Sequence, residues 1–389
     1  MINLRVWGHH RASFGLAGGA AATVRLLREV GCNVACHDLP LASHPAIQSA
    51  PCSQHQSLPV QIDLVHTNPN LLQADPCLLH AADLTAPLRI GYWAWELEAF
   101  PEGWESFLSS YDEIWCPSPF TAQALAQRSP IPVVSVPHYP DWPRLQVLQD
   151  RRRDRRPQAG RAFRFLCLFD FWSTTERKNP DGVIEAFWKA FPPGSSHLPP
   201  VELLIKTSSA EQFPAACNQL MAKTADDPRI HWQHQLLSSD DLDELLLSAD
   251  VLVSLHRSEG FGLVLADAMA IGLPVMATAY SGNLEFMPQG SAALIPWQLI
   301  PIEHTSGDYR RGWLWADPDL NAAAAWMRDL ASDPQVGARL AARGAVAVRE
   351  RLSFERLAPV VRQRLGTLLL KPTRRELLNT SSPVLQSLG

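Results

Sequence analysis

The chain has 389 residues, of which 46% are hydrophobic and 19% are charged, and its formal net charge is -5. This length exceeds one ordinary hydrophobic core and predicts two domains. The composition is typical of a soluble globular protein, and the slight acidic excess excludes a globally basic surface, so we expect no nucleic-acid partner. The N-terminus lacks the long apolar core of a signal peptide, and no stretch of about 18 apolar residues predicts a membrane span. We therefore expect a cytoplasmic protein.

The first half alternates short apolar runs with stretches of helical composition, which is typical of βαβ units. We predict strands over residues 2–7, 33–37, 62–66, 88–93, 113–117 and 133–137. Helices are expected over residues 20–30 and 120–127. Residues 1–150 are therefore predicted to form one doubly wound, Rossmann-like domain.

A cluster of arginines then interrupts the apolar pattern. Residues 150–161 read DRRRDRRPQAGR, and we assign residues 151–161 to a linker. Short charge runs usually remain solvated, so for the arginines between positions 151 and 156 a linker is favoured over a binding surface. The alternative is a peripheral contact with anionic lipid headgroups at the inner face of the membrane.

The second half repeats the alternation of strands and helices. Strands are predicted over residues 163–169, 201–207, 230–234, 251–255 and 274–278, and helices over residues 181–190, 242–249 and 263–270. Residues 162–350 are therefore assigned to a second Rossmann-like domain. The sequence from 321 to 370 has helical composition with a break around Ser353. We expect residues 351–389, a helical segment and tail, to pack back towards the N-terminal domain.

The strongest chemical signal lies in residues 258–270, which read SEGFGLVLADAMA after the apolar run VLVSLH. Gly260 and Gly262 let a ligand approach the backbone, and the first N–H groups of a helix have no partner inside it, so this turn suits an anion such as a diphosphate. Glu259 and Asp267 would repel that anion. We therefore expect them to accept hydrogen bonds from hydroxyl groups, Glu259 from a sugar and Asp267 from a ribose. The alternative is an ordinary helix N-terminus with acidic capping residues.

A second motif, Glu176-Arg177-Lys178-Asn179-Pro180, follows the apolar run RFLCLFDF. It places two cations at the carboxyl end of a parallel strand, where open α/β sheets bind their ligands. The alternative is a surface turn that enters a helix with a proline in its first turn.

A glycine-rich segment follows the first predicted strand and contains Gly15, Gly18 and Gly19. Such glycines let the backbone close on a ligand. A tight turn without any ligand needs the same glycines, so both interpretations stay open.

Aromatic and acidic residues follow the fourth predicted strand. Trp93 and Trp95 offer rings that pack on sugars, and core packing is an equally good interpretation for both. Glu96 adds a carboxylate at the same strand end. The histidines show no H-E-x-x-H spacing, so we expect no metal site.

The strand, turn and helix over residues 251–270 resemble the retaining glycosyltransferases of family 4, which have the GT-B fold and belong to the glycosyl transferases group 1. The signature of that family is Glu, seven residues, Glu, and Asp267 stands here in place of the second Glu. The resemblance covers nearly the whole chain. It implies an α/β protein of two Rossmann-like doubly wound domains that face each other across a cleft, with the donor on the C-terminal domain and the acceptor on the N-terminal domain.

The resemblance also implies an activity. We expect a hexosyltransferase that moves a sugar from a nucleotide diphosphate sugar to a saccharide or lipid-linked acceptor, with retention of anomeric configuration, as in polysaccharide biosynthesis. No metal and no other cofactor is expected, since GT-B enzymes neutralise the diphosphate with a helix N-terminus and basic side chains.

The same resemblance assigns roles to residues. Lys178 matches the lysine that grips the donor diphosphate, and Arg177 is the runner-up because the further upstream arginine of the family is absent here. Many relatives have a histidine after the fourth strand; this chain has none there, and we choose Glu96 as the group nearest the acceptor hydroxyl. Residues 280–286 are expected to shape the pocket wall. The residues expected to bind the donor are Gly260, Phe261, Gly262, Leu263 and Asp267, together with Gly15, Gly18 and Gly19.

Two other functions remain as alternatives. A nucleotide-sugar epimerase or hydrolase of the same fold would bind the donor without needing an acceptor. A non-catalytic GT-B subunit that binds glycan would be expected to lose the diphosphate cation and the sugar-binding acid, and this chain keeps Lys178 and Glu259.

Overall fold

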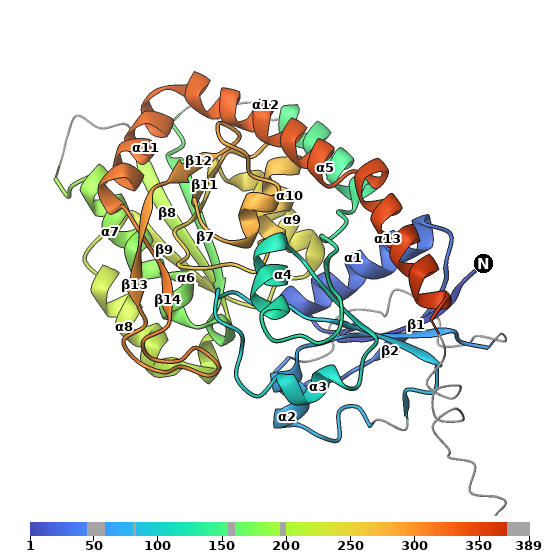
Figure 1. Ribbon diagram of the computed structural model, residues 1–389. Helices are drawn as coiled ribbons and strands as arrows, with labels where there is room; N and C mark the ends of the chain where they lie inside the picture. The colour runs from blue at the N-terminus through green and yellow to red at the C-terminus, as the bar shows by residue number, and fades with distance from the viewer. Residues whose placement is uncertain (45–58, 81–82, 155–159, 195–199, 372–389) are drawn as a thin grey trace, which may run out of the picture.

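The computed structural model describes residues 1–44, 59–80, 83–154, 160–194 and 200–371, and its strands form two six-stranded parallel sheets and one two-stranded hairpin (Figure 1). The first sheet has the order β2-β1-β3-β4-β5-β6 and the second β12-β11-β10-β7-β8-β9. The strands of the first sheet are β1 (Asn3–Gly8), β2 (Asn33–Asp38), β3 (Ile62–His66), β4 (Leu88–Tyr92), β5 (Glu113–Cys116) and β6 (Val133–Ser135). Those of the second are β7 (Phe163–Asp170), β8 (Val201–Ser208), β9 (Ile230–His234), β10 (Val251–Ser254), β11 (Val275–Thr278) and β12 (Ala293–Ile295).

These strand orders confirm the predicted doubly wound α/β fold. In each sheet the chain runs outward first to one side and then to the other, so the order reverses between β1 and β3 and again between β7 and β10. In open α/β sheets, ligands bind outside the carboxyl ends of the strands at such switch points. Every predicted strand agrees with an observed one to within one or two residues. The short β12 was not predicted, nor was the antiparallel hairpin of β13 (Trp297–Pro301) and β14 (Leu314–Pro318).

The helices between the strands are longer than predicted at several places. They are α1 (Gly15–Glu29), α2 (Pro69–Ala74), α3 (Glu105–Leu108), α4 (Pro119–Ala126), α5 (Trp142–Arg153), α6 (Thr175–Lys178), α7 (Pro180–Ala190), α8 (Pro214–Thr224), α9 (Ser239–Ser248), α10 (Leu263–Ala270), α11 (Leu320–Ser332), α12 (Pro334–Arg351) and α13 (Phe354–Leu369). Helix α1 begins five residues before the predicted start at residue 20, so the glycine-rich segment is helical rather than a turn. Glycine costs about 1 kcal/mol in a helix interior, yet the segment is helical here, and Ala17 and Gly19 are buried in it.

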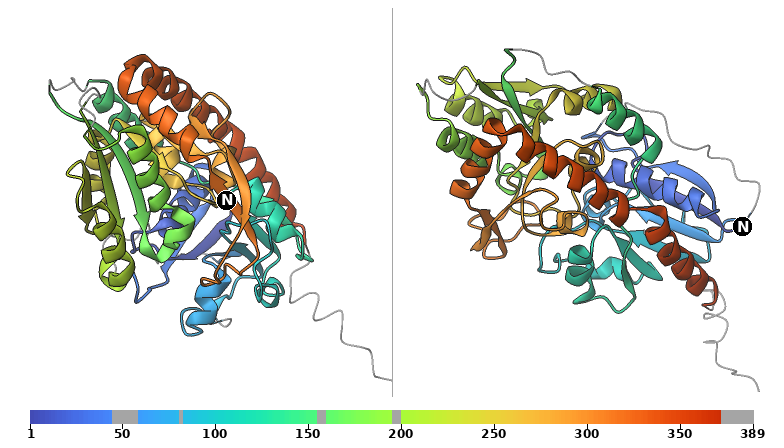
Figure 2. Two further views of the ribbon diagram at one scale, coloured as in Figure 1. Left: turned by 90° about the vertical axis from the view of Figure 1, so that its left-hand side faces the viewer. Right: turned by 90° about the horizontal axis from the view of Figure 1, so that it is seen from above.

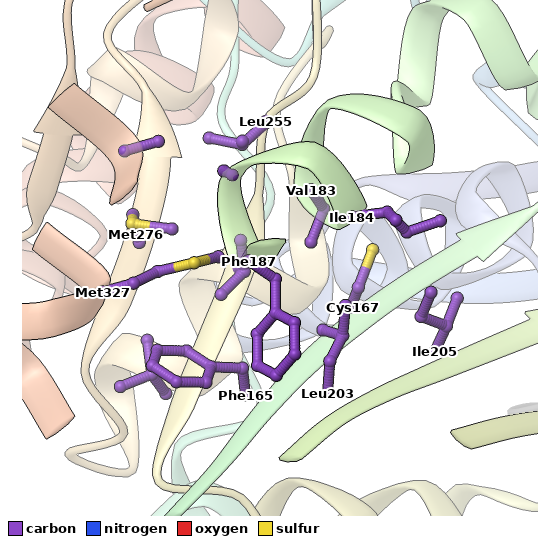
Figure 3. Close-up of a cluster of buried hydrophobic side chains, with 14 of the residues drawn as sticks. Phe165, Cys167, Val183, Ile184, Phe187, Leu203, Ile205, Leu255, Met276 and Met327 are labelled. Carbon is purple, nitrogen blue, oxygen red and sulfur yellow. The ribbon is translucent and has the colours of Figure 1, made fainter. Parts of the chain in front are cut away.

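Both faces of each sheet are covered by apolar side chains from the helices. Successive side chains of a strand point to opposite faces, so in β7 Phe165 packs towards α7 while Leu166 packs towards α9 and α10. Figure 3 shows the first of these clusters, in which Phe165 and Phe187 lie beside Met276 and Met327. The strands therefore read as continuous apolar runs, which is why they are easy to recognise in the sequence.

The arginine cluster between the sheets is partly helical. Residues 151–153, predicted to belong to a linker, form the last turn of α5. Arg152 donates to the carbonyl oxygens of Gly272 and Ala249, each at 3.0 Å, and Arg151 pairs with Glu244 at 2.7 Å. These guanidinium groups therefore bind within the protein.

The last helices connect the two sheets. Figures 1 and 2 show α12 and α13 following one another from the second sheet to the first. Ser353 lies between them and caps α13 by accepting a hydrogen bond from the Arg356 N–H at 3.3 Å, so the break falls where the sequence predicts it. The apolar face of α13, including Val361 and Leu365, is buried against α1 and the first sheet. In the described part of the chain, no helix combines the length and the apolar character needed to cross a membrane.

Candidate functional site

The two charged motifs meet at the carboxyl ends of β7 and β10, which are neighbours in the second sheet. Helix α6 follows β7, and the turn of residues 259–262, named here the EGFG turn, follows β10. Lys178 Nζ contacts Glu259 Oε1, and Arg177 Nη1 lies 3.3 Å from the same oxygen. The structure therefore brings together the acid and both cations that the sequence singles out, at the switch point of the sheet.

Glu259 is an ionised acid in a largely buried position, since its side chain is 11% exposed. Burial alone would raise its pKa, but the charges of Lys178 and Arg177 lower the pKa to about 2. Burial lowers the pKa of the neighbouring His256 to about 4, so that ring is neutral. The backbone N–H of Glu259 donates to Ser281 Oγ at 2.8 Å, which fixes the start of the EGFG turn.

The two adjacent cations have different surroundings. The Arg177 side chain is 4% exposed, and its Nη1 donates to the Ser258 carbonyl oxygen at 2.8 Å. The Lys178 side chain is 20% exposed, and among the described residues its ammonium group forms an ion pair with Glu259 alone. Arg177 is thus part of the buried framework, whereas Lys178 is the cation that a bound anion can reach.

Several residues with a strained backbone conformation lie at this edge of the second sheet. The non-glycine residues with positive φ in the described part of the chain are Thr174, Asn179, Ser209 and Ser281, which follow the ends of β7, β8 and β11. Each such residue costs about 1 to 3 kcal/mol and persists where its surroundings enforce it. Thr174 and Asn179 bracket α6, and Asn179 Nδ2 donates to the Leu255 carbonyl oxygen at 2.9 Å. These contacts hold Lys178 in place relative to β10.

The EGFG turn leads directly into α10. Gly262 is the N-cap with a φ of 91°, and no side chain caps the helix, so its first N–H groups are free to bind an anion. Residue 282 packs so closely on the turn that a Cβ there would lie 1.9 Å from the Gly260 carbonyl oxygen. The Phe261 ring is buried against His138, with ring centroids 4.9 Å apart, so among its groups only the backbone is left to contact a ligand.

Asp267 lies in the second turn of α10, in contact with α5. Its Oδ2 accepts two hydrogen bonds from Arg144, each at 3.0 Å. Arg144 also donates to Asp243 of α9, at 2.8 and 3.0 Å. The Asp267 side chain is 24% exposed, and its Oδ1 has no hydrogen-bond partner among the described residues. One carboxylate oxygen is thus fixed while the other is available to a hydroxyl group.

The first domain docks on the EGFG turn. Ser118, which follows β5, donates its hydroxyl to the Gly260 carbonyl oxygen at 2.7 Å. Ser258 donates its hydroxyl to the backbone carbonyl oxygen of Glu96, which follows β4. Since β4, β5 and β10 all end at these contacts, the carboxyl edges of the two sheets face each other.

Trp93 and Trp95 belong to the core of the first domain. They are 0% and 2% exposed, and both make edge contacts with Trp104. Of the two interpretations left open by the sequence, the structure therefore supports core packing rather than stacking on a sugar.

Glu96 joins the charged cluster from the opposite domain. Its Oε2 accepts a hydrogen bond from the Tyr309 hydroxyl at 3.0 Å, and its Oε1 lies 4.0 Å from Arg177 Nη2. The Glu96 side chain is 20% exposed. The acid chosen from the sequence is thus next to the residues that surround Glu259.

The three glycines of α1 occupy different positions. At Gly15 a Cβ would meet open space, and at Gly18 it would lie 3.1 Å from Leu263 Cδ1 at the start of α10. At Gly19 a Cβ would lie 2.7 Å from His138 Cε1. The structure therefore brings Gly18 next to the start of α10 and places Gly19 against His138 of its own domain.

Three polar residues at the site were not singled out from the sequence, namely Tyr309, Arg144 and Ser118. Each is a lone residue outside a motif, and it reaches the site through tertiary contacts between residues more than 100 positions apart. The start of α5 carries a signal that could have been read, because Asp141 precedes a proline at the first helical turn.

These features were compared with known protein families and solved structures. The family model of Glycosyl transferases group 1 matches residues 173–296, which contain both charged motifs. Sucrose-phosphate synthase from Thermosynechococcus elongatus is similar with a TM-score of 0.62 and 16% identity, over 98% of this chain and 100% of that chain. No curated protein sequence matches the chain.

Two further structures are similar and contain ligands. HepE of Anabaena, in complex with UDP and glucose, has a TM-score of 0.61 and 13% identity over 95% of this chain and 100% of its own. The pneumococcal O-GlcNAc transferase GtfA, in complex with UDP and GlcNAc, has a TM-score of 0.52 and 14% identity over 80% of this chain; this chain spans 57% of GtfA. The chain therefore has the GT-B fold, and its second domain carries the match to glycosyl transferases group 1.

Proposed function

We propose that this chain is a glycosyltransferase that moves a hexose from a nucleoside diphosphate sugar to a saccharide or lipid-linked acceptor. The observation that carries this proposal is the convergence of Lys178, Glu259 and the start of α10 at the end of β10. A cation and free backbone N–H groups suit a diphosphate, and a fixed carboxylate beside them suits the hydroxyl groups of the attached sugar.

In this proposal the charge that develops on the leaving phosphate is stabilised by Lys178 and the N–H groups of α10. A fixed cation stabilises the transition state more than the ground state, because negative charge on the phosphate grows as the glycosidic bond breaks. Glu259 holds the sugar through its hydroxyl groups, and Asp267 accepts a hydrogen bond from the ribose through its free Oδ1.

Retention of configuration and the acceptor class rest on the family resemblance. We propose that the leaving phosphate accepts the proton of the acceptor hydroxyl on the same face of the sugar. Glu96 and Glu259 both lie within 4.0 Å of Arg177, which favours binding roles for these acids over a nucleophilic one. Nuclear magnetic resonance of the product formed from an α-linked donor tests this step: an α-linked product is expected, and a β-linked product would contradict retention.

The proposed reaction does not need a divalent ion, since Lys178 and the backbone of α10 supply the positive charge. In the described ranges, no three His, Cys, Asp or Glu side chains lie close enough to hold a metal ion. Turnover that is unchanged by EDTA is the expected result, and turnover restored by added Mg²⁺ or Mn²⁺ would contradict it.

The first experiment is thermal melting of the protein with a panel of nucleotide sugars. A ligand that binds the folded state raises the melting temperature in relation to its affinity. UDP-sugars are the first choice, since HepE and GtfA were solved with UDP. The stabilising donor is then incubated with and without acceptors. Release of free sugar, or of an epimer, without any acceptor would favour the epimerase or hydrolase alternative, and no stabilisation by any donor would favour the non-catalytic one.

A further inference from the structure

The β13–β14 hairpin of the second domain reaches across to the first domain. The hairpin lies outside both parallel sheets. At the loop end of its strands, Ile302 and Trp315 are 2% and 5% exposed and belong to the apolar cluster of the first domain. At the tip of the hairpin, Asp308 Oδ2 accepts a hydrogen bond from Asn70 Nδ2 at 2.7 Å. The hairpin is thus held by the first domain at the loop end of its strands and at its tip.

Tyr309 is the residue of this tip that reaches the charged cluster. Its backbone N–H and carbonyl oxygen are both paired with Ser306, each at 3.0 Å, and its ring stacks on Trp95 with centroids 5.6 Å apart and planes at 22°. Burial raises the pKa of Tyr309 well above its ordinary value, so the phenol stays protonated. Its hydroxyl donates a hydrogen bond to Glu96 Oε2. Arg177 lies beneath the same ring, at 5.9 Å from its centroid.

Each oxygen of the Glu96 carboxylate therefore has its own neighbour. Oε2 is bound by the Tyr309 hydroxyl, and Oε1 faces Arg177 at 4.0 Å. Without the hydroxyl, the carboxylate would be free to rotate and to form a closer fork with the guanidinium group, which is the geometry that such pairs prefer. The Tyr309 hydroxyl thus prevents the Glu96 carboxylate from forming a two-point ion pair with Arg177.

We propose that Tyr309 is a positioning residue, which holds Glu96 in the orientation that receives a hydroxyl group of the acceptor. This inference rests on the proposed glycosyltransferase function. Because Tyr309 belongs to the second domain and Glu96 to the first, the acid takes this orientation when the two domains are engaged. The orientation of Glu96, a residue of the first domain, therefore depends on a contact with the hairpin of the second domain.

The variant that tests this role is Tyr309→Phe, which keeps the ring and its stacking on Trp95 and removes the hydroxyl. Its kcat is expected to fall about tenfold, with the KM for the donor and the Kd for the nucleoside diphosphate unchanged. A kcat equal to that of the unchanged protein would overturn the proposal. A loss that appeared in the donor KM instead of kcat would also overturn it.

A double-mutant cycle with Glu96→Gln tests whether Tyr309 acts through the acid. The double variant is expected to have the kcat of Glu96→Gln alone, because the hydroxyl has no carboxylate left to orient. Additive losses would show that Tyr309 acts by another route. The matched control is Asp308→Ala, which breaks the bond to Asn70 at the same tip; it is expected to lower the melting temperature and leave kcat unchanged. A kcat loss in this control equal to that of Tyr309→Phe would assign the effect to hairpin docking and overturn the proposal.

The outcomes separate this inference from the proposed function. If the unchanged protein transfers sugar and Tyr309→Phe matches it, the role of Tyr309 falls while the glycosyltransferase function stands. If the unchanged protein transfers no sugar from any donor, the proposed function falls. The same double-mutant cycle read by urea unfolding then tests the contact itself: a coupling between Tyr309 and Glu96 is expected, and a coupling of zero would overturn it.

Discussion

Arg177 and Lys178 are neighbours in the sequence, and their different burial predicts different effects of substitution. Lys178→Ala removes the cation that an anion can reach and leaves the buried framework in place. Turnover is expected to fall about 100- to 1000-fold, as for the loss of one oriented charge-stabilising group. The melting temperature is expected to fall less than in Arg177→Ala, because Arg177 still pairs with Glu259 in the lysine variant. Steady-state kinetics and thermal melting of the same preparation check this. A collapsed melting temperature together with normal specific activity would refute the role.

The matched comparison is Arg177→Ala. This guanidinium group binds the Ser258 carbonyl oxygen and the Glu259 carboxylate, and its side chain is 4% exposed. Removing one partner of a buried ion pair costs about 3 to 5 kcal/mol of unfolding free energy. The arginine variant is therefore expected to be destabilised more strongly than the lysine variant, in which Arg177 still pairs with Glu259.

The low pKa of Glu259 predicts how stability depends on pH. A carboxylate whose pKa is lower in the folded state than its ordinary value stabilises the protein above the ordinary value, and this contribution is lost as pH falls through the folded pKa. The change from 4.5 to about 2 corresponds to about 3 kcal/mol. The free energies of unfolding of the unchanged protein and of Glu259→Gln, measured with urea, should therefore differ by a constant amount above pH 5. This difference should shrink between pH 4.5 and 2. Parallel curves throughout that range would contradict the assignment.

Asp267 is predicted to bind the nucleotide without being needed for folding. In Asp267→Ala the partner Arg144 keeps its bonds to Asp243, so no buried charge is left unpaired. The Kd for the nucleoside diphosphate is expected to rise about tenfold, as for the loss of a hydrogen bond to a charged group, with sugar preference unchanged. Calorimetric titration with the nucleotide alone measures this, and an unchanged Kd would contradict the ribose role.

At the scale of the elements, the sequence predicts strands better than it predicts irregular additions to the fold. The parallel strands are buried on both faces and read as apolar runs between turns, so all predicted strands are observed. The hairpin gives no such signal, because the residues of β13 are mostly exposed and show no alternation. At the glycines of α1 the structure differs from the tight turn considered in the sequence, because α1 already begins at Gly15, and tertiary context often overrides weak local propensity.

The charged motifs of the site could likewise be found in the sequence, and their partners could not. Glu259 and Lys178 follow strands that lie side by side, so the rule that ligands bind at carboxyl ends is enough to bring them together. Tyr309 and Arg144 reach the site from a hairpin and from the helix between the sheets. Their place depends on how the two domains dock, which no local pattern encodes.

Gly282 offers a prediction about the turn as an element. In Gly282→Ala the new Cβ would overlap the Gly260 carbonyl oxygen, which is backbone and cannot rotate away, so the EGFG turn must move. A shift of about 1 Å in such a turn is expected to weaken nucleotide binding and to lower turnover about 100-fold. The matched control is Gly366→Ala in α13, where a Cβ meets nothing within 4 Å. That variant should bind normally and gain up to about 1 kcal/mol of stability from the helix propensity of alanine.

At the scale of the whole molecule, the contacts between the domains include three that come from separate elements. The EGFG turn contacts Ser118, and the preceding Ser258 contacts the backbone of Glu96. The hairpin packs into the core of the first domain, and α13 covers the first sheet. Two of these contacts involve the candidate site, so ligand binding and domain engagement are expected to influence each other. The third lies away from the site and can be tested separately.

Helix α13 provides that test through one ion pair. Arg364 Nε donates to Glu113 Oε1 of β5 at 2.6 Å, and the Glu113 side chain is 0% exposed. Arg364→Ala leaves a buried carboxylate without its cation, which is expected to cost about 3 to 5 kcal/mol of unfolding free energy. Arg356→Ala on the same helix is the control, since that side chain is 54% exposed and lies 3.8 Å from Glu285; its effect should stay within about 0.5 kcal/mol. Because the proposed donor groups lie on the second domain, the folded Arg364 variant should keep the nucleotide Kd of the unchanged protein. A Kd that weakens along with stability would mean that α13 also sets the geometry of the site.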